Sequence, residues 1–351
     1  MREIAVAGTS GKSTASGLLA FLMSKLGLKP NFIGGGRVKQ FETVSEPGNA
    51  LAGRSDYLII EACESDGSLV NYRPQHSIIL NLSLDHHAIE VTSGMFERLI
   101  SHTTEHVIMN DDDTRLAGIR KRGAVTFSIQ NPSDFRAEKI RYKPFSTDFT
   151  VQDTDFTLSL PGEYNLYNAL SCIALLARLG IGLMDMAPLL PEFRGIDRRF
   201  DIHLNEGEHL VIDDYAHNPH KISALMKTVQ PLGPGMCYIF QPHGFAPTRM
   251  MKKEYIDTFV RNLRDSDHLI LLPIFYAGGT AAKDISSDDL VDEIKRAGKS
   301  AEVVYSRDEI ATRVHEWNSY VIFGARDETL SDFAEAIAEK CKRAIVPKLN
   351  R

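Results

Sequence analysis

A glycine-rich loop close to the start of the chain constrains its fold more than any other feature. The loop, Gly8–Thr14 (GTSGKST), lies between a short apolar run, Glu3–Ala7, and a stretch of helical period, Ala15–Leu26. A strand, a glycine-rich loop and a helix in this order bind polyphosphates, because the N–H groups of the loop and the N-terminus of the helix point at the anion. The segment therefore predicts an α/β domain that binds a nucleotide.

Two side chains of the loop suit the chemistry of a nucleoside triphosphate. Lys12 would contact the β- and γ-phosphates, and Ser13 would reach Mg²⁺. The match to the pattern GxxxxGK[ST] is imperfect, because its first glycine would fall at Val6; the alternative is a turn that only packs. Nucleotide binding alone does not distinguish a kinase, a GTPase or a ligase. The residues predicted to bind ATP or GTP are Gly8, Thr9, Ser10, Gly11, Lys12, Ser13 and Thr14.

Apolar runs continue along the chain in an order typical of a parallel sheet. Tyr57–Glu61 and Ser77–Asn81 are continuous, and a helical stretch, Met95–His102, and another strand, Val107–Met109, follow them. Continuous apolar strands separated by helices indicate a parallel sheet covered on both faces. Residues 145–160 instead alternate apolar and polar side chains, which predicts an antiparallel hairpin.

A second β/α series begins after Asp197. Its first strand is His209–Asp213, and further strands are predicted at 237–240, 268–272, 302–305 and 320–323. We therefore predict an α/β fold with two domains. Residues 1–196 would form a P-loop ATPase domain with a mostly parallel sheet, and residues 197–351 a Rossmann-like C-terminal domain.

Composition excludes several classes of protein. The 351 residues include 40 Lys and Arg against 46 Asp and Glu, a net charge of −6, which does not favour binding to nucleic acid or to an anionic membrane. The apolar stretch Leu18–Met23 is far shorter than the roughly 20 residues of a membrane span. Four widely spaced cysteines without a CxxC pair fit a reducing compartment. We expect a cytoplasmic protein with small-molecule partners.

Acidic and histidine side chains follow two neighbouring strands. Glu61 and Glu64 come at the end of the first, and Asp85 and His86 follow the second. Ligands of α/β proteins bind at the carboxyl ends of parallel strands, and oxygen and imidazole groups suit Mg²⁺ or Mn²⁺. An Asp-His-His run alone is more often a capped turn. Two such groups in a phosphate-loop domain favour a metal site made by Ser13, Glu64 and His86.

Seven segments, in order along nearly the whole chain, resemble motifs of the Mur ligase family, which are ATP-dependent enzymes that join a carboxylate to an amino acid. They are Ala7–Thr14, Glu61–Asp66, Asn81–His86, Gly162–Ala169, Gly195–Phe200, Asp213–Pro219, and Gln241–His243 with Thr248–Arg249. Each is weak alone, but seven in order make chance a poor explanation. The closest resemblance is to the UDP-N-acetylmuramate:L-alanine ligases and their murein-recycling relatives.

The resemblance implies roles for residues that the patterns alone do not single out. Asn165 and Asn168 would lie near the nucleotide base, Arg199, or its neighbour Arg198, near the phosphates, and Asp214 at the ribose. On the side of the incoming amine, the implied residues are His243 and Arg249.

The implied chemistry is acyl activation, in which a carboxylate takes the γ-phosphoryl group and an amine then displaces phosphate. His217 is a candidate acceptor for the amine proton; the alternative is a structural histidine in a turn. The catalytic residues that follow, with ATP and Mg²⁺ or Mn²⁺ as cofactors, are Lys12, Glu64, His86, Arg199 and His217.

Departures from the family pattern leave the substrates open. Tyr164 and Asn218 replace family histidines, and Gly244 stands where the family has an arginine. The subgroup begins with a domain of about 100 residues, the size of a small domain, that holds the uridine nucleotide. This chain begins at the ATP-loop strand, so we expect the UDP site to be absent. Two alternatives to a ligase acting alone are an ATP-binding subunit whose partner supplies acceptor binding and a non-catalytic regulator.

Overall fold

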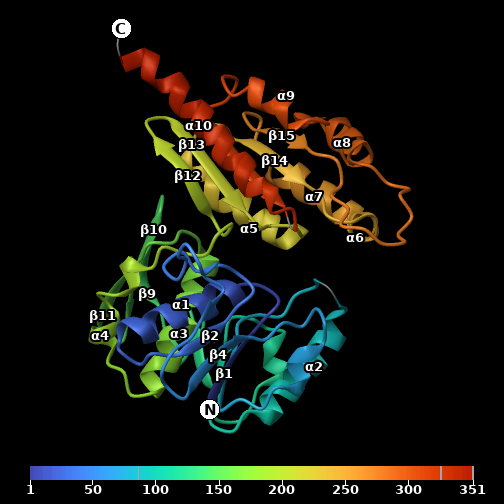
Figure 1. Ribbon diagram of the computed structural model, residues 1–351. Coiled ribbons are helices and arrows are strands. Elements are labelled where there is room, and N and C mark those ends of the chain that lie inside the picture. Colours follow the sequence, from blue (N-terminus) through green and yellow to red (C-terminus); the bar gives the residue numbers. More distant parts are fainter. Residues whose placement is uncertain (86, 325, 350–351) are drawn as a thin grey trace. The chain divides into compact units, whose positions relative to one another are not determined.

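The computed structural model describes residues 1–85, 87–324 and 326–349, with side chains up to residue 344 (Figure 1). The chain divides into two compact units, Met1–Asp197 and Arg198–Arg351. Each unit is built on a mostly parallel sheet with helices packed on it, which confirms the predicted α/β class. None of the helices in the described residues is both long and apolar enough to cross a bilayer.

The first unit contains an eight-stranded sheet with the order β3-β2-β4-β1-β5-β6-β7-β8. All neighbouring strands are parallel except β2 and β3. The strands are β1 (Arg2–Ala7), β2 (Asn31–Ile33), β3 (Ala50–Leu51), β4 (Tyr57–Glu61), β5 (His76–Ile79), β6 (His106–Asn110), β7 (Val125–Ser128) and β8 (Phe135–Arg136). Successive side chains of the central strand β1 point to opposite faces of the sheet, and its last four are all buried, because helices cover both faces.

Helices α1 (Lys12–Lys25) and α3 (Glu163–Arg178) pack against each other on one face, and α2 (Ile89–His102) lies on the other (Figure 1). Ile4 and Val6 of β1 belong to the core under α1 and α3, whereas Ala5 and Ala7 belong to the core under α2. This double burial explains why β1 is a continuous apolar run. The shorter helices are η1 (Ser68–Asn71), η2 (Leu116–Ile119), α4 (Leu183–Met186) and η3 (Leu190–Glu192).

Two helices begin earlier than predicted. Helix α1 begins at Lys12 rather than Ala15, directly after Gly11, whose φ of 87° ends the loop. Helix α2 begins at Ile89 rather than Met95. The first turn of α1 carries polar side chains, and that of α2 alternates Ile89 and Val91 with polar residues, so neither shows the apolar helical period on which the predictions rested. Similarly, β5 ends at Ile79, two residues before the predicted end.

The predicted hairpin is confirmed as part of a three-stranded antiparallel sheet. Strands β9 (Glu138–Lys143), β10 (Ser146–Val151) and β11 (Thr154–Leu158) have the order β11-β10-β9. The turn residues Gln152 and Asp153 both have positive φ, 45° and 64°, as tight hairpin turns require. The sequence pattern missed β9 because Glu138–Lys143 is mostly charged and exposed.

The second unit contains a six-stranded sheet with the order β12-β13-β17-β14-β15-β16, in which only β12 is antiparallel. Its strands are β12 (Asp201–Glu206), β13 (His209–Asp214), β14 (Cys237–Gln241), β15 (His268–Leu271), β16 (Ala301–Val303) and β17 (Ser319–Gly324). Strand β16 begins one residue before the predicted span 302–305 and ends two residues before its end.

Helices cover both faces of this sheet. They are α5 (Pro219–Val229), η4 (Gln230–Leu232), α6 (Phe245–Met250), α7 (Lys252–Asn262), α8 (Ser287–Arg296), α9 (Arg307–Thr312) and α10 (Thr329–Leu349). Residues of α9 and α10 share a core with one face of the strands. On the other face, the ring of Phe240 lies 5.5 Å from that of Tyr255 and 5.6 Å from that of Phe259, both in α7.

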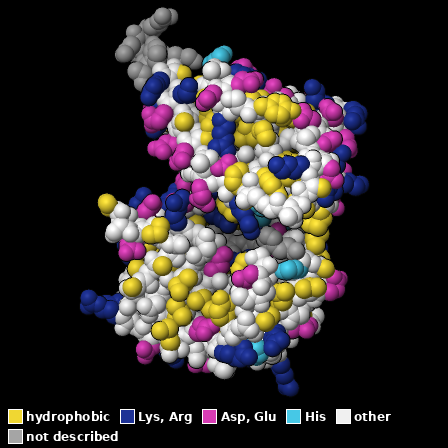
Figure 2. Space-filling view, turned by 45° about the vertical axis from the view of Figure 1, so that its right-hand side comes forward, with side chains coloured by type: hydrophobic (Ala, Val, Ile, Leu, Met, Phe, Trp, Pro, Cys, Tyr) yellow, Lys and Arg dark blue, Asp and Glu magenta, His cyan; other side chains and the backbone are white. Residues whose placement is uncertain are grey.

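Basic and acidic side chains are mixed on the face of the protein that Figure 2 shows.

A buried histidine lies at the start of β5. The ring of His76 is fully buried and stacks on that of His106 with centroids 5.3 Å apart, and its Nε2 lies 3.5 Å from the carboxylate of Glu105. Burial lowers the pKa of His76 to about 4, because a charged ring would lose its hydration, although Glu105 opposes this shift.

Acid should therefore destabilise the first unit through His76. The folded pKa lies below that of the unfolded chain, so this contribution to stability is complete above about pH 6.5 and is lost as pH falls towards 4. We expect the free energy of unfolding to fall by about 2 kcal/mol more between pH 7 and pH 5 in the native chain than in His76→Phe. Denaturant unfolding at both pH values measures this difference. Equal losses in the two proteins would contradict it.

Candidate functional site

The candidate site lies where the carboxyl ends of β1, β4 and β5 meet. Strand β1 is the central one of the three, and the phosphate loop follows it directly. Glu61 ends β4, Glu64 follows it, and Asn81 comes two residues after β5. A ligand is expected here, at the carboxyl ends of parallel strands where the order of connections changes direction. The fold thus brings together side chains from three separate parts of the sequence.

Lys12 and Glu64 form a buried ion pair in this site. Lys12 Nζ donates to Glu64 Oε2 over 2.8 Å and to the carbonyl oxygen of Gly8 over 2.7 Å. Lys12 is 8% exposed and Glu64 1%. The sequence assigned Lys12 to phosphates and Glu64 to a metal, but it did not predict that each would bind the other. A buried charge must be neutralised, and here the loop lysine and the strand carboxylate neutralise each other.

Two buried oxygens of the site fit a bound nucleotide and cation. Within the described part of the chain, Glu64 Oε1 and Ser10 Oγ have no hydrogen-bond partner. Burying an oxygen without a partner costs about 1–3 kcal/mol, so these atoms suit a group that binds there. His86 lies outside the described residues, and no three His, Cys, Asp or Glu side chains within them gather as a metal site. The site predicted from Ser13, Glu64 and His86 therefore stays a prediction.

Ser13 has a carboxylate partner of its own. Its hydroxyl donates to Glu61 Oε1 over 3.1 Å, and Glu61 Oε2 accepts the backbone N–H of Gly35 over 2.7 Å. Ser13 and Thr14 are both buried in the first turn of α1. The two side chains that chemistry requires of the loop, Lys12 and Ser13, are thus each held by a glutamate from the end of β4.

The side chain of Asn81 holds the phosphate loop through the backbone of Ser10 and the hydroxyl of Thr9. The sequence did not predict this role of Asn81. Its Oδ1 accepts from the N–H of Ser10 over 2.8 Å and from the hydroxyl of Thr9 over 2.9 Å, and its Nδ2 donates to the carbonyl of Ser10 over 2.9 Å. Ser83 N–H also donates to Thr9 Oγ1. The signal in the sequence was that Asn81 begins one of the segments that resemble family motifs, at the end of a predicted strand.

Glycine is required in the loop because α3 comes very close to it. A Cβ on Gly11 would lie 2.3 Å from Asn168 Oδ1, and Gly11 also has φ of 87°. Asn168 and Asn165 are both buried, and Asn165 donates to the carbonyl of Pro161 over 2.8 Å. The structure places Asn168 against the phosphate loop. The roles of both residues at the nucleotide base stay predictions.

In the second unit, Arg198 and Arg199 differ in their surroundings. Arg198 is 3% exposed and donates to the Asp213 carboxylate over 3.0 Å and to the carbonyls of Gly324 and Asp327. Burial nevertheless raises the pKa of Asp213 to about 6, against the effect of Arg198. Arg199 is half-buried, with its guanidinium 4.6 Å from the centre of the Tyr215 ring. Arg198 therefore stabilises its own unit, and a role at the phosphates stays a prediction for Arg199.

Asp214 is held by the backbone around it. Its two oxygens accept the N–H groups of Phe200 and Ala216, each over 2.7 Å. Burial raises the pKa of Asp214, while Arg199 and these two N–H groups favour its charged form. The predicted contact with a ribose would add to these hydrogen bonds, since a carboxylate oxygen can accept more than one.

His217 is held by the backbone near it. Its Nδ1 lies 2.9 Å from the carbonyl oxygen of Tyr215, and since a carbonyl can only accept, Nδ1 is the donor in this hydrogen bond. Its role as acceptor of the amine proton stays a prediction. The rings of His217 and Tyr215 make an edge contact at 5.5 Å. Tyr215, which also contacts both arginines, is a site residue that the sequence analysis missed.

His243 and Arg249, predicted for the amine side, both contact the segment after β15. The ring of His243 stacks on that of Phe275 at 6.3 Å. Arg249 forms an ion pair with Asp284 and donates to the carbonyl of Ala282 over 3.0 Å. Their role towards an amine stays a prediction.

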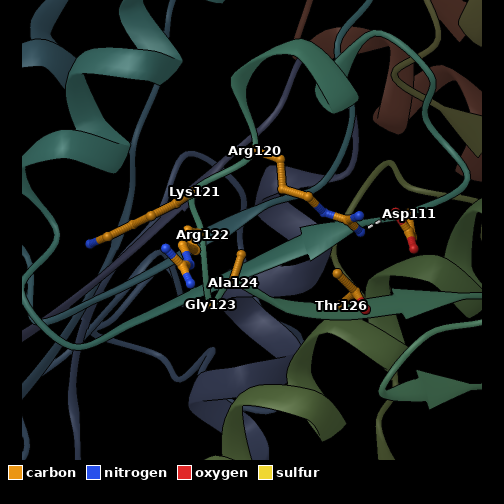
Figure 3. A pocket seen from close by; sticks show the side chains of 7 residues that line it. All are labelled: Asp111, Arg120, Lys121, Arg122, Gly123, Ala124 and Thr126. Carbon is orange, nitrogen blue, oxygen red and sulfur yellow. Dashed lines mark hydrogen bonds and ion pairs between the residues drawn. The ribbon is translucent and has the colours of Figure 1, made fainter.

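A hollow elsewhere in the first unit does not contain this site. Its volume is about 390 Å³, and it opens beside the turn before β7 (Figure 3). Two of its cations are already engaged, because Arg120 pairs with Asp111 and Lys121 donates to the carbonyl of Thr103. Its lining contains none of the residues of the phosphate loop.

Comparisons with known proteins agree on one family. Residues 6–176 match the Mur ligase middle domain, and residues 198–326 match the Mur ligase, glutamate ligase domain. The UDP-N-acetylmuramate–L-alanine ligase of Fusobacterium nucleatum is 31% identical over 368 residues, which cover 96% of this chain and 75% of that protein. The enzyme of the same name from Legionella pneumophila is 29% identical over 325 residues, 86% of this chain and 67% of its own length.

Among solved structures, the UDP-N-acetylmuramate-alanine ligase MurC of Thermotoga maritima matches with a TM-score of 0.76 and 25% identity. The match covers 99% of this chain and 76% of that one. The likeness therefore extends over both units.

A prediction about stability follows from the buried pair of Lys12 and Glu64. Lys12→Met should lower the free energy of unfolding by about 3–5 kcal/mol, because it leaves the Glu64 charge buried and unpaired. Adding Glu64→Gln should restore most of the loss without restoring nucleotide binding. Denaturant unfolding measures both effects. Lys253→Met, which breaks the exposed pair with Asp257, is the control, with an expected change of about 1 kcal/mol at most. No recovery in the double variant would contradict the prediction.

Removing the side chain of Asn81 should loosen the loop. Asn81→Ala removes three hydrogen bonds that shape the loop, together worth about 3 kcal/mol. If about half of this free energy is then needed to order the loop when ATP binds, the affinity for ATP should fall by roughly tenfold. Isothermal titration calorimetry measures the binding. The matched control is Asn71→Ala, an exposed asparagine on η1, which should bind as the native chain does. Equal affinities for the two variants would exclude the role of Asn81.

Proposed function

This chain belongs to the Mur ligase family of ATP-dependent ligases, and on that premise we propose that it joins a small-molecule carboxylate to an amine through an acyl phosphate. The observation that carries the proposal is the phosphate loop, in which Lys12 is buried against Glu64. In the described structure, Glu64 Oε1 and Ser10 Oγ are buried without hydrogen-bond partners.

Binding of ATP would exchange the partners of the buried pair. The phosphates offer Lys12 a stronger negative charge than a single carboxylate, and the loop N–H groups and the start of α1 add their dipoles. Glu64, once separated from Lys12, needs a new cation. A divalent ion such as Mg²⁺, held by Ser13 and Glu64 together with His86, would neutralise phosphate charge when bound. The rate gain then comes mainly from positioning and charge neutralisation.

The reaction has two steps. In the first, a carboxylate oxygen of the acceptor forms a bond to the γ-phosphorus, and the bond from that phosphorus to the ADP oxygen breaks. In the second, the amine nitrogen attacks the carbonyl carbon, and inorganic phosphate leaves with the acceptor's former carboxylate oxygen. The amine proton would pass to His217, whose Nδ1 is held by the carbonyl oxygen of Tyr215.

We assign the phosphate loop and the contacts of Asn165 and Asn168 with the base to residues 1–196. From residues 197–351, Arg199 would also meet the phosphates, Asp214 the ribose, and His243 with Arg249 the amine. Each of these assignments rests on the resemblance of its motif to that of the family. ATP as phosphoryl donor supports a cytoplasmic location.

The names of the relatives suggest the first substrates to test, UDP-N-acetylmuramate and L-alanine. The replacements at Tyr164, Asn218 and Gly244 lie in motifs that flank the nucleotide and the amine, so other pairs must be included. A smaller carboxylate or a murein fragment is the alternative acceptor. A partner subunit that supplies acceptor binding is the alternative arrangement.

Substrate-dependent release of ADP and phosphate tests the activity. We expect release only when an acceptor carboxylate and an amino acid are both present, from a panel of UDP-N-acetylmuramate, N-acetylmuramate and short peptides against amino acids. Lys12→Met/Glu64→Gln, which should fold, should release none. Tight ATP binding without release for any pair would contradict a ligase that acts alone and would favour the partner subunit.

Isotope transfer tests the acyl phosphate. With both carboxylate oxygens of the active acceptor labelled with ¹⁸O, the released phosphate should carry one ¹⁸O atom, because that oxygen leaves with phosphorus. Mass spectrometry of the phosphate measures this. Unlabelled acceptor with labelled water should leave the phosphate unlabelled. Phosphate that takes its oxygen from water would exclude the mechanism.

A further inference from the structure

Arg307 lies at the carboxyl ends of two neighbouring strands of the second sheet but has no role in the reaction as proposed. It begins α9, and its Nη2 donates to Gln241 Oε1 over 2.8 Å and to the carboxylate of Asp327. Its Nη1 donates to the hydroxyl of Thr329 over 2.7 Å. Gln241 ends β14, Asp327 follows the neighbouring strand β17, and both are 7% exposed. One guanidinium thus joins the segments that follow two buried strands.

The hydrogen bond from Arg307 fixes the orientation of the Gln241 amide. A guanidinium can only donate, so the amide turns its accepting oxygen towards Arg307 and its NH₂ group away from it. That NH₂ group donates to the carbonyl oxygen of Pro273, in the segment after β15, over 3.3 Å. In the opposite orientation, a donor would face a donor and an acceptor would face an acceptor. Arg307 therefore determines that Gln241 joins the end of β14 to the segment after β15.

The same two segments carry residues predicted for the amine side. His243 follows Gln241 by two residues, and its ring stacks on that of Phe275. The N–H of Gly244 donates to the carbonyl oxygen of Phe275, and the N–H of Phe275 to that of Pro242, each over 2.8 Å. Because these hydrogen bonds continue the contact that Gln241 begins, a shift of the segment after β15 would displace His243.

We propose that Arg307 is a positioning residue for the amine, which acts on His243 through Gln241 and the segment after β15. The proposal rests on the proposed function, since it assumes an amine at His243. It adds that the affinity for the amine depends on a residue of α9 that need not touch the amine. The phosphate loop belongs to the other unit, so the affinity for ATP should depend little on Arg307.

Two substitutions and their combination test this role. Gln241→Met removes both hydrogen bonds of the amide but keeps the pair of Arg307 with Asp327. Arg307→Met removes that pair as well. If Arg307 acts through Gln241, the effects of the two substitutions on the amine are not additive, whereas independent effects add.

Arg313→Met is the matched control. Arg313 follows α9, and its side chain is 24% exposed, against 26% for Arg307. Each guanidinium also lies over an aromatic ring, at 5.5 Å for Arg313 and 5.6 Å for Arg307. Arg313 pairs instead with Glu302 and Glu316, which belong to neither of the two segments.

The first measurement is the KM for each substrate in the assay of ADP and phosphate release, with the acceptor and amino acid that the native chain uses. The KM for the amine should rise by roughly tenfold in Gln241→Met and in Arg307→Met, the order of one hydrogen bond to a charged group. In the double variant it should rise no more than about twofold further. The KM for ATP should stay within about twofold, and Arg313→Met should match the native chain for both substrates.

Hydrogen–deuterium exchange measures the positioning without turnover. The N–H groups of Gly244 and Phe275 should exchange roughly tenfold faster in Gln241→Met and in Arg307→Met than in the native chain, because the hydrogen bonds between the two segments open more often. Arg313→Met should leave this exchange unchanged. If thermal unfolding shows that Arg307→Met does not fold, Gln241→Met, which keeps the pair with Asp327, decides by its KM and its exchange.

Several results would overturn the proposal. An unchanged KM for the amine in Gln241→Met would do so, as would unchanged exchange at Gly244 and Phe275. Additive effects would show that Arg307 does not act through Gln241, and equal rises in KM for the amine and for ATP would show a purely structural role. In all of these cases the native chain still turns over, so the proposed function stands. If the native chain uses no pair of substrates, the proposed function fails, and this inference fails with it.

Discussion

The buried ion pair between Lys12 and Glu64 is the interaction on which the site depends. Two charges removed from water are costly, and the attraction between them offsets that cost only while both stay in place. The pair therefore fixes the phosphate loop after β1 against the segment after β4, two parts of the chain that are 52 residues apart. Under the proposed function, a polyphosphate and a cation together would take the place of the two partners. Either one alone would leave the other partner buried without a counter-charge.

Hydrogen bonds from neighbouring elements hold the rest of the loop. Asn81 binds Thr9 and Ser10 from the end of β5, Asn168 lies against Gly11 from α3, and Glu61 binds Ser13. Because these contacts come from three sides, the loop backbone is shaped before any ligand binds. Preorganised N–H groups need no rearrangement when charge arrives, which is the main electrostatic advantage of a protein site over water. The closeness of α3 explains why Gly11 cannot be larger.

Most of the buried strands could be predicted from the sequence, whereas the edge strands of the sheets and the exact ends of helices and strands could not. Tyr57–Glu61 and the strands of the second sheet are continuous apolar runs, because helices cover both faces. The strands missed are β2, β3, β7, β8, β9 and β12, which lie at or near sheet edges and are short or largely polar. Of these, β7 is buried, but its four residues alternate apolar and hydroxyl side chains. In the site, the phosphate loop and the carboxylates at the end of β4 were predicted from their residue types and from their positions directly after predicted strands. Asn81 and Tyr215 were missed, because each acts through contacts with groups distant from it or with neighbouring backbone.

The sequence by itself determined the class of fold, the phosphate loop and the family, because these depend on local patterns and on the order of motifs along one chain. Only the tertiary structure decided which side chain binds which. It paired Lys12 with Glu64 and Ser13 with Glu61, although both glutamates follow the same strand, and it engaged Arg198 with Asp213 while its neighbour Arg199 lies on Tyr215. Such choices depend on distances of a few ångströms and on burial, and neither is encoded in the spacing of residues along the chain.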